Sequence, residues 1–390
     1  MPHIKSYIIT IFNVFICLSS VFILLQAIRF IGDLNEKSLR KKRKRGFGYR
    51  QDVFEIKEDK VYKNNRSSIQ KIDGEKLCKY DNGDIYKGEF LNGKKNGFGV
   101  CVFLNKERYE GLWKDDKMHS IGKYTYSDGS TYSGDFKNGY MDGLGRYEYK
   151  NKDVYKGYFK ENKKNGKGVM HYNNGSRYIG TWVNDEQCGT GKFIKFNGDI
   201  YEGEFEGSKF NGNGRYEFKD GSVYTGIFKN NVFHERGVYT DKNGNIYDGE
   251  FQYGYKNGNG TLKKIDGDIY EGDFKDDLFD GKGRYKYHNK GIYEGEFKKG
   301  KRDGIGTYIC EKYKYIGEWK DDKKGKIGTY YMESGGVLEV RIIDEKIEEG
   351  IYKFEEEKEK ILKDIDIRGE KEDILIEKFN KKHRNHFKHI

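Results

Sequence analysis

The feature that most limits how this chain can fold is a short element that returns every 23 residues. Tyr-x-Gly occurs ten times in strict phase, and an eleventh copy arrives one residue early. Two residues after each of these glycines stands a Phe or a Trp. Copies in fixed phase define a repeat array, in which each repeat packs mainly against its neighbours. The repeats begin at Tyr86, Tyr109, Tyr132, Tyr155, Tyr178, Tyr201, Tyr224, Tyr247, Tyr270, Tyr293 and Tyr315.

Within each repeat the informative residues are spaced by two. If the first Tyr is position 0, Gly stands at position 2, the ring at position 4, Gly-x-Gly at positions 11 and 13, and most often Tyr at position 15. Side chains at i, i+2 and i+4 share one face of a strand. Each repeat therefore predicts two short strands, with rings and glycines on one face and Lys, Glu, Asp and Thr on the other.

The residues between these strands are typical of tight hairpin turns. Asn92-Gly93 follows a first strand and Asp128-Gly129 follows a second one, and similar pairs recur in most copies. Asn, Asp and Gly tolerate the positive φ that such turns need. Pro2 is the only proline, so every strand amide is free to donate to a neighbouring strand.

The glycines inside strands leave room for a ring from the neighbouring strand to lie on the backbone. We therefore predict that the repeated residues are structural and carry no chemistry. In five of the repeats these residues are Tyr86, Gly88, Phe90, Tyr132, Gly134, Phe136, Tyr178, Gly180, Trp182, Tyr201, Gly203, Phe205, Tyr270, Gly272 and Phe274.

The motif Tyr-x-Gly-Glu/Asp-Phe/Trp, followed by Gly-x-Gly-x-Tyr and Asp/Asn-Gly, resembles the MORN repeat (membrane occupation and recognition nexus). The likeness implies an elongated, twisted array of antiparallel hairpins, which we place at 83–343. It also implies scaffolding, dimerisation and tethering close to a membrane, and for some members phosphoinositide binding. The first Gly of Gly-x-Gly is replaced by Ser120, Glu235 and Lys326, so copies two, seven and eleven depart most from the motif.

The net charge of +11 lies at the ends of the chain and not on the array. Residues 36–50 carry +7, residues 380–390 carry +4 and residues 1–35 carry +1, which leaves −1 for residues 51–379. A nucleic-acid-binding array would carry a basic groove along its length. We therefore predict no nucleic-acid partner.

The first domain, 1–35, contains 22 uncharged residues at 7–28, enough to cross a bilayer as a helix. A cleaved signal peptide is the main alternative, and a buried helix is the other. The apolar run is longer than a usual signal core, and no small-x-small cleavage site follows it cleanly. We therefore predict an uncleaved single-pass membrane anchor, without identifying the membrane.

The second domain, 36–82, is a basic linker that begins next to the predicted span. It carries the run Lys41, Lys42, Arg43, Lys44 and Arg45. The side richer in Lys and Arg stays cytoplasmic, so the array is predicted to face the cytosol. We expect the run to contact an anionic lipid surface. A nuclear-localisation signal or a simple stop-transfer flank are the alternatives.

The last domain, 344–390, changes composition to Glu, Lys and Ile. Ile351, Phe354, Leu362 and Ile365 fall near helical spacing. We predict a charged helical segment that caps the open end of the array, and a partner-binding or coiled-coil segment is the alternative. The predicted fold class is thus an all-β repeat array, a twisted single sheet of consecutive hairpins, with an N-terminal membrane helix and a C-terminal helical segment.

Residues typical of catalytic or metal sites are scattered. The five cysteines form no Cys-x-x-Cys pair, which favours a reducing compartment. His383, His386 and His389 lack a carboxylate or Cys that would complete a metal site. The Gly-x-Gly copies lack the setting of a dinucleotide loop. We therefore predict no catalytic residues, no metal and no cofactor.

These observations favour a non-catalytic, membrane-anchored scaffold whose protein partner the sequence does not identify. The alternative is a phosphoinositide-binding module, and an enzyme of unrecognised type is a remote one. We also expect a homodimer, because a single sheet with rows of rings on one face would leave apolar surface exposed, and exposed apolar surface usually marks an interface.

Overall fold

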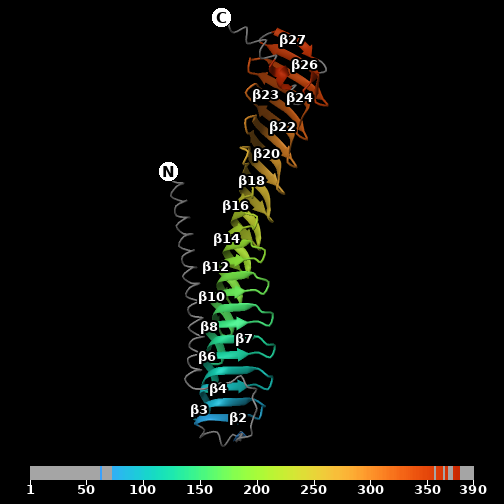
Figure 1. Ribbon diagram of the computed structural model, residues 1–390. Coiled ribbons are helices and arrows are strands. Elements are labelled where there is room, and N and C mark those ends of the chain that lie inside the picture. The colour runs from blue at the N-terminus through green and yellow to red at the C-terminus, as the bar shows by residue number, and fades with distance from the viewer. Residues whose placement is uncertain (1–61, 64–72, 355–356, 363–364, 368–371, 378–390) are drawn as a thin grey trace, which may run out of the picture. The chain divides into compact units, whose positions relative to one another are not determined.

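The computed structural model describes residues 62–63, 73–354, 357–362, 365–367 and 372–377. The chain divides into two compact units, 1–196 and 197–390, and Figure 1 labels many of their strands. The predicted membrane helix at 7–28 and the basic run Lys41–Arg45 lie outside the described residues. Among the residues that the structure describes, no helix is long and apolar enough to cross a membrane.

In the first unit, strands β2 to β12 pair in chain order, each antiparallel to the next. The two-residue β1 pairs in parallel with β2. The strands are β1 (Tyr62–Lys63), β2 (Gly74–Lys79), β3 (Ile85–Leu91), β4 (Lys94–Val102), β5 (Arg108–Lys114), β6 (Lys117–Thr125), β7 (Thr131–Lys137), β8 (Tyr140–Glu148), β9 (Val154–Lys160), β10 (Lys163–His171), β11 (Arg177–Val183) and β12 (Glu186–Ile194). The antiparallel strand order thus begins with β2, before the predicted start of the array at residue 83.

Each repeat supplies two strands, as the spacing of two predicts. In β3 the buried side chains are Tyr86 and Phe90, with Gly88 between them, and the intervening residues are more exposed. Tyr86 lies opposite Cys101 and Gly88 lies opposite Gly99 on β4. The consecutive antiparallel hairpins of the prediction are therefore confirmed for the described repeats.

The first glycine of Gly-x-Gly lies in a β-bulge, and this bulge contacts the side chain at position 3 on the neighbouring strand. The register between β7 and β8 shifts after Gly134, and Gly143 has a φ of 116°. The backbone N–H of Leu144 donates to Asp135 Oδ2 at 2.9 Å. A Cβ on Gly143 would lie 2.7 Å from the Asp135 Cβ, so glycine leaves the room that this carboxylate occupies.

The two kinds of turn also have the geometry that their residues predict. Asn92 and Gly93 both have positive φ, 53° and 75°, as a type I′ hairpin requires. At the second turn the N–H of Gly129 donates to the carbonyl of Tyr126 at 3.1 Å, and the φ of Gly129 is 90°. Where lysine replaces this glycine, as at Lys152, the φ is still 73°.

The second unit repeats the same plan. Its strands are β13 (Ile200–Glu206), β14 (Lys209–Glu217), β15 (Val223–Lys229), β16 (Val232–Thr240), β17 (Ile246–Gln252), β18 (Tyr255–Lys263), β19 (Ile269–Lys275), β20 (Leu278–Tyr287), β21 (Gly291–Lys298), β22 (Lys301–Ile309), β23 (Tyr313–Lys320), β24 (Lys323–Met332), β25 (Val337–Ile343), β26 (Lys346–Phe354), β27 (Glu357–Leu362) and β28 (Ile365–Asp366). β13 to β27 pair antiparallel in chain order, and β28 also pairs with β26.

The predicted C-terminal helical segment is wrong for Lys346–Phe354, Glu357–Leu362 and Ile365–Asp366, which continue the sheet as β26, β27 and β28. Within the part of 344–390 that the structure describes, only residues 372–377 are helical. β25 and β26 form a twelfth, aliphatic repeat, whose buried Leu338, Val340, Ile342 and Ile347 stand at positions 0, 2, 4 and 9. The open edge of β25 offers unpaired backbone groups to β26, and pairing with them overrides the helical propensity of a Glu- and Lys-rich chain.

Replacing Ser120 by glycine is expected to stabilise the first unit by about 1 kcal/mol. Ser120 takes the bulge position with a φ of 59°, which costs a non-glycine residue roughly 1–2 kcal/mol. The measurement is the urea midpoint of the full chain. Ser133→Gly, in the strand β7, is the matched control and should destabilise by about 0.5–1 kcal/mol. An unchanged or lower midpoint for Ser120→Gly would contradict the strain.

Candidate functional site

The position-0 tyrosines lie in the core of each unit. Tyr132 is fully buried, and its hydroxyl donates to the carbonyl of Asp135 at 2.9 Å. Its ring lies edge-to-face with Phe136 of its own repeat and with Phe159 of the next, at centroid distances of 5.1 and 5.0 Å. The ring also lies over Gly145, where a Cβ would meet the Tyr132 Cζ at 2.5 Å.

The same arrangement holds at each sequence-predicted structural position. The rings at positions 0 and 4 are 0 to 5 % exposed, and the glycine at position 2 lies against the hydroxyl of its own tyrosine. The rings at positions 0 and 4 therefore pack against the glycines and rings of the sheet itself. In the described repeats these rings are therefore not available as an apolar face for a second copy, and the homodimer expected from the sequence stays a prediction.

A set of cations lies among these rings, and the sequence reasoning missed it. The Lys95 Nζ lies 4.7, 5.2 and 4.7 Å from the ring centroids of Tyr80, Tyr86 and Trp113. These rings come from position 17 of the preceding strand pair, position 0 of the same repeat and position 4 of the next repeat. A cation over aromatic rings gains about 0.5–2 kcal/mol, more when water is excluded.

Two further cages follow the same rule. The Lys164 Nζ lies 4.7 Å from the ring centroid of Trp182, and the Arg302 Cζ lies 4.1 Å from that of Trp319. All three tryptophans of the chain thus face a position-9 cation of the preceding repeat. Most other repeats have Met, Gln or Phe at position 9 and Phe at the next position 4, and Lys256 and Lys324 are the exceptions. Comparing these two positions along the array would have revealed the cages.

Acidic turn residues complete two of the cages. Lys164 donates to the Tyr149 hydroxyl at 3.2 Å and lies 4.0 Å from Asp185 Oδ1, and burial lowers the pKa of its ammonium. Arg302 Nε lies 3.2 Å from Asp322 Oδ1. Asp185 and Asp322 are the second residues of the type I′ turns in the next repeats. A half-buried cation in these sites is thus held by rings on one side and a carboxylate on the other.

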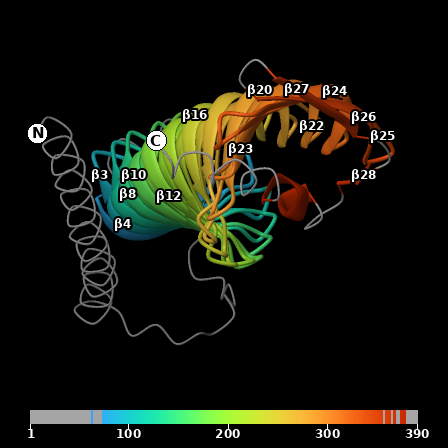
Figure 2. The ribbon, with the colours of Figure 1, turned by 90° about the horizontal axis from the view of Figure 1, so that it is seen from above.

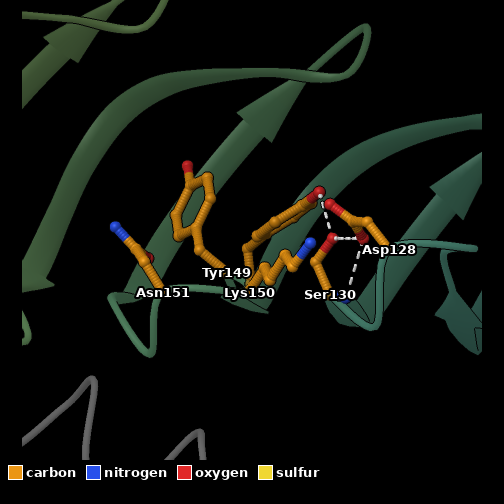
Figure 3. Close-up of a pocket in the computed structure, with 6 residues that line it drawn as sticks. Asp128, Ser130, Tyr149, Lys150 and Asn151 are labelled. Carbon is orange, nitrogen blue, oxygen red and sulfur yellow. Dashed lines mark hydrogen bonds between the residues drawn. The ribbon is translucent and has the colours of Figure 1, made fainter.

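An open hollow of about 540 Å³ lies between two neighbouring turns of the first unit. Figure 3 shows Asp128 and Ser130 on one side and Tyr149, Lys150 and Asn151 on the other. Ser130 N donates to Asp128 Oδ1 at 2.8 Å, and the Ser130 hydroxyl donates to the same oxygen. Asp128 and Ser130 are hydrogen-bonded to each other. The hollow is therefore lined by polar groups and contains no activated nucleophile.

The acidic and sulfur-bearing residues that the structure describes do not gather into a reaction centre. Asp135 and its counterparts Glu89 and Asp273 each accept from the backbone N–H of their own bulge. In the described ranges no three His, Cys, Asp or Glu side chains are placed to hold a metal ion. The buried Cys101 is a free thiol, and burial raises its pKa to about 11. The three tail histidines lie outside the described residues.

A comparison with known protein families agrees with this repeat structure. The MORN repeat matches residues 86–107, 109–131, 132–154, 155–177, 178–200, 201–223, 224–246, 247–269, 270–292, 293–313 and 315–337. The chain belongs to the MORN repeat family. The matches begin at the position-0 tyrosines, so the family motif and the buried ring ladder are the same residues. The aliphatic twelfth repeat of β25 and β26 lies beyond the last match.

No curated protein matches this MORN protein. It is similar to the TCP10 domain of Danio rerio CPAP in complex with a peptide of Danio rerio STIL, at 14% identity and a TM-score of 0.34. That likeness covers 55% of this chain and 93% of the other. The SAS-4 (dCPAP) TCP domain of Drosophila melanogaster, bound to a proline-rich motif of Ana2 (dSTIL), has 15% identity and a TM-score of 0.22 over 46% and 84% of the chains. At these scores the likeness carries no argument about function.

Proposed function

We propose that this MORN protein is a non-catalytic interaction scaffold, held at a membrane by its N-terminal segment and facing the cytosol. The observation that carries the proposal is the burial of the repeated aromatic residues within the sheet. The repeated rings at positions 0 and 4 are buried in the sheet, and the exposed surface consists largely of polar turns and charged strand positions, with separate exposed apolar side chains such as Leu104 and Ile265. Such a surface suits contacts with protein partners, and no converged set of reactive groups lies on it among the described residues.

The membrane part of the proposal is supported by the sequence. Residues 7–28 are long and apolar enough for a span, and Lys41–Arg45 follow at a distance suited to anionic lipid headgroups. The near-zero charge of residues 51–379 supports protein contacts over lipid contacts along the array. Basic side chains near a leaflet contribute about 1 kcal/mol each, and the array has no basic excess to supply it.

The full chain is expected to stay with cell membranes through a high-salt wash and to enter the detergent phase on phase separation. A variant that lacks 7–28 should be released, because the basic run alone gives salt-sensitive binding. A variant with glutamine at all five positions from Lys41 to Arg45 is the matched control and should keep the detergent partition. Release of the full chain by salt alone would contradict the anchor.

The phosphoinositide-binding alternative is tested separately. The full chain in detergent is titrated with soluble inositol phosphates, and no saturable, headgroup-selective binding is expected. Selective binding that is lost on replacing the exposed array lysines Lys87 and Lys156 by glutamine, but kept when Lys41–Arg45 are replaced, would make the array itself a lipid-binding module.

A further inference from the structure

The last cage of the second unit differs from the others in where its anion comes from. Lys324 stands at position 9 of the eleventh repeat, on β24, and its side chain is 9% exposed. Its Nζ lies 4.6 Å from the ring centroid of Tyr315, 4.8 Å from that of Tyr330 and 5.2 Å from that of Tyr313. Burial lowers the pKa of this ammonium, so the site requires a nearby anion to hold the charge.

The anion is the carboxylate of Glu372, which belongs to the short helix 372–377. The Tyr330 hydroxyl donates to Glu372 Oε1 at 2.7 Å, and the Tyr313 hydroxyl donates to the same oxygen at 3.2 Å. Lys324 forms an ion pair with that oxygen as well. Three donors thus converge on one carboxylate oxygen whose side chain is 16% exposed. Charge-assisted hydrogen bonds of this kind are the stronger ones in proteins.

The turn carboxylate that completes two of the earlier cages binds a different side chain in this repeat. By repeat position the counterpart of Asp185 and Asp322 is Glu345, in the turn between β25 and β26. Glu345 Oε2 instead accepts from the exposed Lys323 Nζ at 3.0 Å. The last cage therefore takes its carboxylate from a segment 48 residues further along the chain.

Two further observations place the helix against the sheet. Ile376, four residues after Glu372, is fully buried, and Lys312 Nζ lies 3.8 Å from Asp373 Oδ1 between two largely exposed side chains. Figure 2 shows this helix within the curve of the last strands. A helix of six residues is not stable alone in water, so its contacts with the sheet hold it in this conformation.

We propose that the Lys324 site is a receptor for a short acidic helix of a partner protein, and that residues 372–377 are its exchangeable occupant. The ligand class is a Glu or Asp followed four residues later by a large aliphatic residue, as in Glu372 and Ile376. The inference rests on the proposed scaffold function, since it names the kind of partner. Its test involves no membrane, so its failure would leave the anchor untouched.

The test measures binding of a fluorescent peptide with the sequence of Lys371–Asn380 to the full chain in detergent, by anisotropy. Glu372→Ala in the chain should empty the site and raise the affinity for the peptide at least about tenfold over the wild-type chain, whose own segment competes. Adding Lys324→Met should abolish this gain. Lys323→Met, a change at the exposed neighbouring lysine, is the matched control and should keep it.

Circular dichroism checks that each variant is folded. If the alanine variant is not folded, Glu372→Gln is used as a milder change that weakens the binding of the chain's own segment to the Lys324 site. A peptide with glutamine in place of its Glu372 should bind at least about tenfold more weakly, as expected for loss of a charge-assisted contact. The proposal is overturned if folded opened variants do not bind the peptide, or if they bind equally with and without Lys324.

A second copy of the chain is the competing occupant, and light scattering distinguishes it. If the segment of one copy fills the site of another, the wild-type mass will double with concentration and Glu372→Ala will remain a monomer. That result would replace the partner helix by self-exchange and overturn the proposal. A wild-type mass that does not depend on the Glu372 substitution is the expected result.

Discussion

Replacing Gly145 by alanine is expected to lower the free energy of unfolding of the first unit by about 3 kcal/mol or more. The new Cβ would lie 2.5 Å from the Tyr132 Cζ, far inside van der Waals contact. The ring cannot move aside, because it is fully buried and its hydroxyl is bound to the Asp135 carbonyl. The measurement is urea unfolding of the full chain, followed by circular dichroism.

The control separates crowding from backbone strain. Gly129 has a φ of 90° and no neighbour within 4 Å of an added Cβ, so Gly129→Ala should cost only about 1–2 kcal/mol. Tyr132→Leu combined with Gly145→Ala should cost less than the sum of the two single changes, because the ring that clashes is gone. Strict additivity would show that Gly145 is needed for another reason.

The sequence predicts the repeated part of the fold well because the residues that determine each hairpin lie within one repeat. Spacing by two fixes the buried face, as in Tyr86, Gly88 and Phe90, and the turn residues fix the hairpins. The bulge at Gly143 is harder to predict, because a positive φ inside a strand has no signature beyond a glycine. The role of the bulge is clear only from the structure, in which the bulge makes room for the Asp135 carboxylate and donates a backbone N–H to it.

The end of the second unit was mispredicted because local composition and tertiary context disagree there. Residues 346–366 are rich in Glu, Lys and Ile and lack the Tyr-x-Gly motif, so helical spacing is the stronger local signal. The exposed edge of the preceding strands changes the outcome by offering backbone partners. The burial of Leu338 and Ile347 at repeat positions 0 and 9 shows that these aliphatics replace the missing aromatics.

The candidate site depends on contacts that one repeat does not contain. Each of the three cages at Lys95, Lys164 and Arg302 joins a ring of one repeat, a cation of the same repeat and a tryptophan of the next. These cages can therefore be recognised in the sequence only when the copies are aligned. The contact of Glu372 with Lys324 cannot be found that way, because the carboxylate comes from outside the repeats. Only the fold brings this segment to the last cage.

Above about pH 10 each unit is expected to unfold in one steep, cooperative step. The position-0 tyrosines are the reason, and they are Tyr86, Tyr109, Tyr132, Tyr155, Tyr178, Tyr201, Tyr224, Tyr247, Tyr270, Tyr293 and Tyr315. Burial, the largest cause at every one of them, raises the pKa of Tyr224 to about 12 and the pKa of the other ten further.

The direction of the effect follows from proton linkage. In the unfolded chain a tyrosine ionises near pH 10, whereas in the folded units these hydroxyls keep their protons. The folded state therefore binds more protons above pH 10, so its stability is fully present below that pH and falls as the pH rises. Each buried tyrosine contributes a loss of about 1.4 kcal/mol per pH unit. The six in the second unit together give about 8 kcal/mol per pH unit, comparable with the whole stability of a domain.

The measurement is phenolate absorbance of the full chain against pH, recorded together with circular dichroism. The absorbance of the buried tyrosines should rise in the same narrow interval in which the sheet signal is lost, with a steepness that needs several protons. The urea-unfolded chain is the control, and its tyrosines should titrate gradually around pH 10. Gradual titration of all tyrosines with the sheet signal intact would mean that the rings ionise in place. That outcome would contradict the burial that the repeat register imposes on them.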